Sequence, residues 1–179
     1  MNGDTKVHGR PRGRASRAWI GSLFLSLAGC GGSLATAGGG ATDAAAFAHT
    51  TASERGQSTG PAEWFTGTTT VSPLFAPNGS RDFGAATVVF EAGARTAWHT
   101  HPAGQTLVVT EGTGWVQLEG EARVEIHAGD VVWIPPGIRH WHGATATSAM
   151  THVALQGAVD GSVVDWLEHV TDADYLGSE

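Results

Sequence analysis

Between residues 66 and 157, short runs of β-branched and apolar residues alternate with turn-forming residues. The runs are Thr68–Phe75, Ala85–Glu91, Thr106–Glu111, Gly114–Glu119, Arg123–His127, Val131–Ile134 and Ala149–Gln156. Many short strands at close spacing are typical of an all-β sandwich or barrel. Segments 111–114 and 119–121 combine glycine with polar residues and are predicted to be hairpin connections. Apolar positions 163, 166, 167 and 170 share one helical face, which predicts a short C-terminal helix over Val163–Val170, packed against the barrel.

The first thirty residues follow a different pattern. Five basic side chains lie within the first seventeen residues and precede an apolar run over 18–27. This run is shorter than the ~20 residues that span a bilayer, and the order is typical of a secretory signal. Leu27-Ala28-Gly29-Cys30 resembles a bacterial lipobox. We therefore predict a signal peptide over 1–29, cleaved before Cys30, which becomes the lipidation site; the alternative is an ordinary signal with an incidental cysteine.

Residues 30–60 are rich in Gly, Ala, Ser and Thr and lack apolar periodicity. Such a composition predicts a flexible tether, which leaves 61–179 as the folded domain. A lipid on the cysteine would hold the exported protein in the bacterial cell envelope without a spanning helix. The expected location is the periplasm, the outer membrane or the cell surface.

Composition narrows the possible functions. The chain has 179 residues and a formal net charge of −7, but the 150 residues from Cys30 onward contain five arginines, sixteen acids and no lysine, a net charge of −11. So acidic a segment lacks the basic surface that a nucleic-acid partner needs. The absent lysine excludes a Schiff-base amine, and a single cysteine excludes a disulfide framework or a CxxC site. Six of the nine histidines lie between positions 99 and 152.

The histidines occur at spacings that favour a shared site. His99 and His101 are two apart in an extended segment, so their imidazoles point the same way. Gln105 follows a Pro-Ala-Gly turn, and His140 follows a turn, a strand and a Pro-Gly corner. Three imidazoles and one amide oxygen on rigid strands would suit a divalent transition metal with open positions for substrate.

Two spaced motifs carry a family resemblance. Gly93-x5-His99-x-His101-x3-Gln105-x6-Gly112 resembles the first cupin motif, and Gly129-x5-Pro135-x-Gly137-x2-His140 resembles the second. The resemblance implies a double-stranded β-helix barrel, a cupin jelly roll, with a metal inside. Gln105 stands where the first motif usually has Glu, and Ala144 replaces an Asn that often closes the second. A neutral amide leaves the metal one unit more positive, a stronger Lewis acid that is held less tightly. The alternative is a barrel whose site has decayed.

A longer similarity runs from Pro61 to Asp172 and points to the small manganese cupins with R-selective hydroxynitrile lyase activity. It is carried by Pro61–Gly67, Gly93–Pro102, Gly104–Leu107, Gly129–Trp133, His140–Ala144, Ala149–His152 and Val164–Asp172. The resemblance implies Mn²⁺, with Fe²⁺, Ni²⁺ and Zn²⁺ as alternatives, held by His99, His101, Gln105 and His140. It also implies that His152 is the general base, and that Ala86, Val88 and Gln156 line the substrate pocket.

Strand alternation supports the assignment of His152. Positions 150, 152, 154 and 156 share one face, so this imidazole lies between small and apolar residues and faces the expected cation. Both surroundings disfavour its charged form and keep it available as a base, although a structural core histidine would have the same pattern. His142 could orient a ligand or lie at the rim, with a structural role favoured. Arg95 could bind an anionic substrate or form a salt bridge.

These observations give a leading hypothesis and two alternatives. The leading one is a metal-dependent lyase that reversibly converts a cyanohydrin into an aldehyde and cyanide, with a small-molecule substrate and no nucleic-acid partner. A dioxygenase would use the same histidine-held metal with O₂. A non-catalytic cupin would bind a small sugar or acid at the cell surface. Family membership leads us to expect a homo-oligomer, either a dimer or a tetramer.

Overall fold

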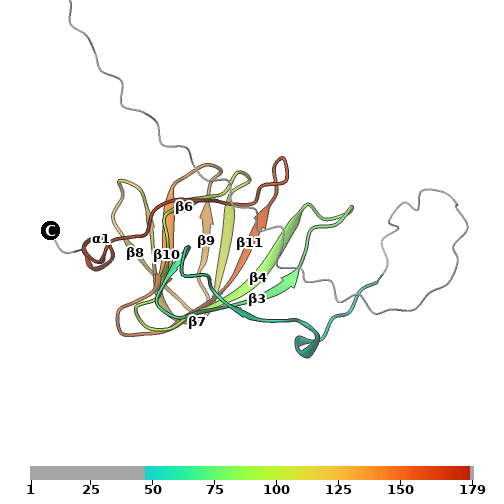
Figure 1. The fold of residues 1–179 in the computed structure, drawn as a ribbon, viewed down its shortest axis with the longest axis horizontal. Helices are drawn as coiled ribbons and strands as arrows, with labels where there is room; N and C mark the ends of the chain where they lie inside the picture. Colours follow the sequence, from blue (N-terminus) through green and yellow to red (C-terminus); the bar gives the residue numbers. More distant parts are fainter. Residues whose placement is uncertain (1–46, 178–179) are drawn as a thin grey trace, which may run out of the picture.

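Twelve β-strands, joined by antiparallel pairing into one curled sheet, form the framework of residues 47–177, the part of the chain that the computed structural model describes (Figure 1). Seven are longer strands: β3 (Thr69–Phe75), β4 (Phe83–Phe90), β7 (Gln105–Leu118), β8 (Val124–His127), β9 (Val131–Ile134), β10 (His140–Ala144) and β11 (Met150–Gly157). Five have two residues: β1 (Ser58–Thr59), β2 (Phe65–Thr66), β5 (Arg95–Thr96), β6 (His99–Thr100) and β12 (Asp165–Trp166). The helices are η1 (Ala52–Glu54), a 3₁₀ turn, and α1 (Asp172–Leu176).

Strand β7 connects the two halves of the curled sheet. Its first half pairs with β11 and β9, and the sheet continues from β11 through β4 and β3 to β1. Its second half pairs with β8 and β10, which in turn pairs with β5 and β6. Because the two halves curl toward each other, the inward side chains of both line one interior. This arrangement confirms the predicted all-β barrel.

The outer ends of the predicted strands are confirmed to within two residues, but one predicted hairpin is wrong. Segment 111–114 lies inside β7 instead of connecting two strands. Gly112 adopts a positive φ of 73° there, and the β7–β11 register shifts beside it, between Thr151 and His152. The glycine therefore bends a continuous strand from one half of the sheet into the other. The second prediction, at 119–121, is confirmed because β7 and β8 pair on either side of it.

The predicted C-terminal helix exists but lies further along the chain than expected. Residues 163–170 contain no helix; within them β12 pairs with β6 through Trp166 opposite His99. The backbone N–H of Leu167 also donates to Trp98 O at 2.9 Å. Pairing with β6 thus replaces the helical bonds that apolar spacing alone suggested. Helix α1 begins after Thr171, whose hydroxyl accepts a hydrogen bond from the backbone of Asp174 at 3.0 Å.

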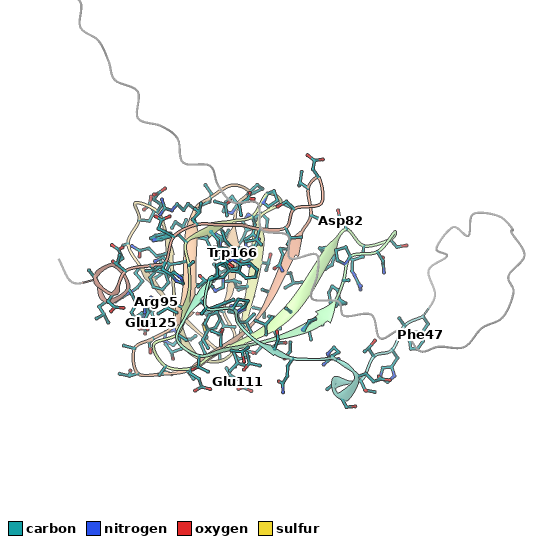
Figure 2. All side chains as sticks on the ribbon, in the orientation of Figure 1. Phe47, Asp82, Arg95, Glu111, Glu125 and Trp166 are labelled. Carbon is teal, nitrogen blue, oxygen red and sulfur yellow. The ribbon has the colours of Figure 1, made fainter. Side chains whose placement is uncertain are left out.

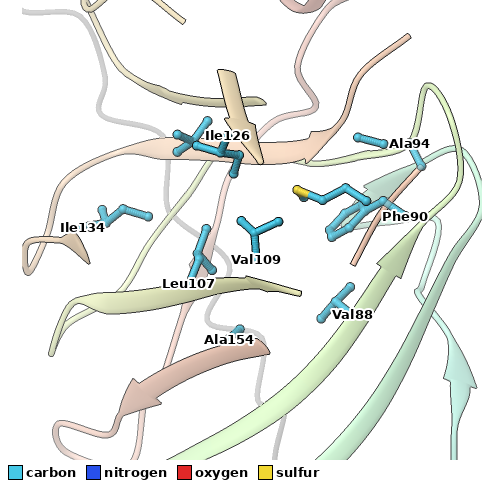
Figure 3. Close-up of a cluster of buried hydrophobic side chains, with 11 residues drawn as sticks. Val88, Phe90, Ala94, Leu107, Val109, Ile126, Ile134 and Ala154 are labelled. Carbon is cyan, nitrogen blue, oxygen red and sulfur yellow. The ribbon is translucent and has the colours of Figure 1, made fainter. Parts of the chain in front are cut away.

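Inward side chains from both halves of the sheet pack into one apolar cluster (Figure 3). Phe90, Leu107, Val109 and Met150 are among its most buried members, each at most 1% exposed. Their positions follow the alternation along β4, β7 and β11. The alternation of inward and outward residues along these strands therefore accounts for this apolar cluster.

A second buried cluster attaches α1 to the barrel. It contains Trp98, Trp141, Val170 and Tyr175. The Tyr175 hydroxyl donates to Ala144 O at 2.9 Å, which ties the helix to the end of β10. The C-terminal segment is thus part of the folded domain.

The N-terminal predictions lie mostly outside the described residues. The signal peptide, Cys30 and residues 31–46 of the tether belong to this group. The first pairing strand, β1, lies just before residue 61, where the sequence analysis places the start of the domain. Within 47–177 no helix is long and apolar enough to cross a membrane.

Candidate metal centre and cavity

Five histidines from three parts of the chain meet inside the barrel. His99 and His101 lie on and just after β6, His140 and His142 lie on β10, and His152 lies on β11. The β6–β10 pairing sets His140 directly opposite His99. All five are between 0 and 4% exposed. The sequence placed four of them in a candidate site; the structure adds His142 to the same group.

Backbone carbonyls fix the orientation of three imidazoles. The Nδ1 atoms of His99, His101 and His140 lie 3.0, 2.6 and 2.8 Å from the carbonyl oxygens of Ala97, Val163 and Ile138, respectively. A carbonyl can only accept, so each Nδ1 must donate, and in a neutral ring Nε2 then carries the lone pair. Such a bond on the far nitrogen is the usual way in which proteins hold a metal-binding imidazole.

The fourth predicted ligand, Gln105, lies against this group. Its Oε1 atom is 3.2 Å from His140 Nε2. With the His140 lone pair on Nε2, this contact brings two acceptors together, an arrangement that a cation between them would stabilise. Two ligand atoms of one ion, each ~2.1 Å from the metal, lie about 3 Å apart. The buried Nε2 of His101 also has no hydrogen-bond partner among the described residues. The four residues therefore fit a transition metal.

A second set of nitrogens is even more compact. Ligand atoms of His99, His140 and His142 all lie within 4.8 Å of one another. His142, however, has its Nδ1 atom 3.2 Å from His152 Nε2, so this ring lies between the candidate metal ligands and the predicted base. Sequence alternation on β10 could have identified it, because His140 and His142 are two apart, as His99 and His101 are.

Burial keeps the histidines neutral. It lowers the pKa of His101, His140 and His152 to about 4, mainly because the charged form loses its water. Burial also lowers the pKa values of His99 and His142 well below 6.5, and the neighbouring histidines add to the effect. Neutral imidazoles are the form that binds metals and accepts protons.

Four of the five histidines, His99, His101, His142 and His152, line a cavity of about 310 Å³. Ala86, Val88 and Gln156, the predicted pocket residues, all line it, as does His152. Trp166 forms part of the wall beside His99, with ring centroids 4.8 Å apart, and appears near the centre of the barrel in Figure 2. The Oε1 atom of Gln156 is buried without a partner in the 47–177 region. Apolar surface with a few converging polar groups is typical of small-molecule sites.

Arg95 is a structural residue and does not line this cavity. Its guanidinium bonds to Asp172 at 2.6 Å and to Val170 O at 3.0 Å, and it lies over the Tyr175 ring. The side chain is 5% exposed and labelled near α1 in Figure 2. Of the two predictions for Arg95, the salt bridge is confirmed.

The fold is a curled antiparallel barrel, and its interior holds buried histidines beside an apolar cavity. These features define the class of double-stranded β-helix proteins with a histidine-rich candidate metal site. Comparison with known proteins identifies the family within this class. The "Cupin domain" family model matches residues 86–155. A curated (R)-mandelonitrile lyase from Granulicella tundricola is 61% identical over 116 residues, which cover 65% of this chain and 88% of that protein. The chain belongs to the cupin family.

Solved structures agree with this assignment. A cupin-like protein from Thermotoga maritima is 41% identical with a TM-score of 0.65, over 70% of this chain and 94% of that one. The polyketide cyclase RemF from Streptomyces resistomycificus has a TM-score of 0.58 at 15% identity, over 73% of this chain and 91% of its own. The second likeness concerns the fold alone.

Proposed function

We propose that this cupin is a metal-dependent lyase that cleaves a cyanohydrin into an aldehyde and cyanide. The observation that carries the proposal is the site: neutral, buried histidines at one side of an apolar cavity, in a chain 61% identical to a protein named (R)-mandelonitrile lyase. The cavity provides room for an apolar substituent, and the histidines provide metal ligands and a proton acceptor in the same space.

His99, His101, Gln105 and His140 would hold the ion. Bound Mn²⁺, or Fe²⁺, Ni²⁺ or Zn²⁺ in its place, would act as a Lewis acid toward the substrate oxygen. Because all four ligands are neutral, the ion would keep its full positive charge. The carbonyl bonds to three of the Nδ1 atoms hold the rings in place, so little reorganisation is needed on binding.

His152 would take the proton of the substrate hydroxyl. Its Nδ1 atom has no hydrogen-bond partner in the described part of the chain, and its Nε2 atom contacts His142. Burial lowers the pKa of His152 to about 4, so at neutral pH the ring is uncharged and one of its two nitrogens can accept a proton. As the proton leaves, the O–H electron pair forms the carbonyl bond and the C–CN pair leaves with cyanide. The protonated ring then returns its proton to cyanide.

The test is mandelonitrile cleavage by Mn²⁺-loaded protein, followed by the absorbance of benzaldehyde. His152→Ala should lower kcat by about 10²–10⁴-fold, the usual contribution of a general base. His127→Ala is the matched control, because that side chain is 58% exposed at a strand end beside Glu125. Unchanged turnover in His152→Ala would remove this residue from the mechanism, and oxygen uptake without cyanide release would favour a dioxygenase.

The metal ligands can be tested separately by metal analysis of purified variants. Gln105→Glu should raise metal affinity, since a carboxylate adds a negative charge to the ligand set. His142→Gln should keep the metal content and lower kcat, because its ring is engaged with His152. Loss of metal in His142→Gln would instead favour the compact set of His99, His140 and His142.

We also propose that the protein is exported and lipidated at Cys30, on the sequence pattern alone. Expression in bacteria with labelled palmitate should label the wild-type chain and leave Cys30→Ser unlabelled. Equal labelling of both would exclude this cysteine as the lipidation site.

A further inference from the structure

The cavity extends well beyond the histidines. Its floor consists of the inward residues of three adjacent strands, which pair in rows across the sheet. One row is His152 on β11, Val88 on β4 and Val71 on β3. The next is Ala154, Ala86 and Pro73 on the same strands. The cavity therefore runs across the strands, away from the half of the barrel that holds the metal-binding group.

Strand spacing gives the extent of this floor. Gln105, on β7, pairs with Gln156 on β11, which continues to β4 and β3. Three steps between neighbouring strands span about 14 Å at ~4.8 Å each. A single aromatic ring attached to a carbinol carbon is much shorter than this. A one-ring substrate bound at the histidines would thus leave the β3 side of the cavity unfilled.

The residues along this path favour an apolar ligand. In the second row, Ala154 and Ala86 have small side chains, which leave space above the sheet for a chain or ring of the ligand. Pro73, Phe75 and Pro77 form the far wall. None of the lining residues, all within 47–177, is an aspartate, glutamate, lysine or arginine. The lining itself thus offers no charged side chain to pair with a charged group on the ligand.

We infer that the site takes an elongated, uncharged substrate, with its reactive carbon at the histidines and an apolar tail of about two rings over Ala86 and Ala154. The reactive end of this inference rests on the proposed lyase function, whereas the tail rests on the cavity alone. Ala86 is then a specificity-determining residue, because a larger side chain there would block the path to β3.

The test measures binding of two unreactive alcohols to the metal-loaded protein by isothermal titration calorimetry. They are benzyl alcohol, with one ring, and 4-phenylbenzyl alcohol, with two. Burying the second ring should tighten binding by about tenfold to a hundredfold, as for burial of a phenylalanine side chain. Equal affinity for the two alcohols in the wild-type protein would overturn the inference.

The substitution Ala86→Leu should reduce this preference to less than about threefold, since the leucine side chain would fill the space between Ala154 and Pro73. Thr87→Leu is the matched control: it lies one position along β4, on the outer face, and should keep the full preference. If circular dichroism shows that Ala86→Leu is unfolded, Ala86→Val provides a smaller block with an intermediate effect. A preference that survives both blocks in folded protein would overturn the inference.

The two proposals fail separately. Protein that prefers the two-ring alcohol but cleaves no cyanohydrin would refute the lyase and keep the elongated site. Protein that cleaves mandelonitrile but shows no preference for the longer alcohol would keep the lyase and refute the elongated site.

Discussion

Acidification should destabilise the metal-free protein strongly. In the folded chain, burial lowers the pKa of His101, His140 and His152 from 6.5 to about 4. In the unfolded chain the same rings are in water and take up protons near pH 6.5. Between about pH 4 and 6.5 the unfolded state therefore binds more protons than the folded state. The stability is fully present above pH 6.5 and is lost as the pH falls toward 4.

The size of the effect follows from these two pKa values. For one such histidine, moving from pH 7.5 to pH 5 lowers the free energy of unfolding by about 2 kcal/mol. Three independent histidines would lower it by about 6 kcal/mol, which is comparable to the whole stability of many domains, about 5–15 kcal/mol. His99 and His142 add to the loss, because burial lowers their pKa values as well.

The assay is urea unfolding of chelator-treated protein at several pH values between 7.5 and 5. The slope of the unfolding free energy against pH gives the difference in bound protons. A change below about 1 kcal/mol between pH 7.5 and 5 would refute the reasoning. It would mean that the folded chain takes up protons at these rings, and hence that water reaches them.

Two further predictions concern the scaffold. Gly112→Ala should lower the free energy of unfolding by more than about 2 kcal/mol, because φ is 73° and a Cβ would lie 2.0 Å from Ala149 O. Gly120→Ala, with φ 80° and no atom within 4 Å of its Cβ among the described residues, should cost only about 1 kcal/mol, and equal melting temperatures for the two variants would contradict the clash. Arg95→Met should cost about 2–3 kcal/mol by chemical denaturation, since it leaves the Val170 carbonyl and the Tyr175 ring without their partner. Asp172→Asn should cost less, because that carboxylate is 85% exposed, and a larger loss in Asp172→Asn would refute this account.

How much of the fold could be predicted depended on whether local spacing or long-range pairing decides each segment. β-branched runs alternate with period two over β3, β4 and β11, and those strands were predicted to within a few residues. Apolar positions over 163–170 fit a helical period, but β6 offers Trp166 a paired strand, which no local pattern can indicate. The bend at Gly112 was likewise mistaken for a turn. Glycine marks a positive φ, and only the pairing partners decide whether the strand ends there.

In the candidate site, too, local spacing predicts which side chains share a face, and long-range strand pairing decides which of them come together. Spacing two apart shows that His99 and His101 share a face, and motif order suggested that His140 joins them. Where these histidines meet inside the barrel is set by the β6–β10 pairing of His99 with His140, two residues that are 41 positions apart in the sequence. The same pairing determines where His142 lies. Two residues after His140 on β10, its ring contacts His152 inside the barrel and does not lie at the rim. A histidine in this barrel is thus assigned its role by the partner that faces it across the interior, and not by the spacing that places it on its own strand.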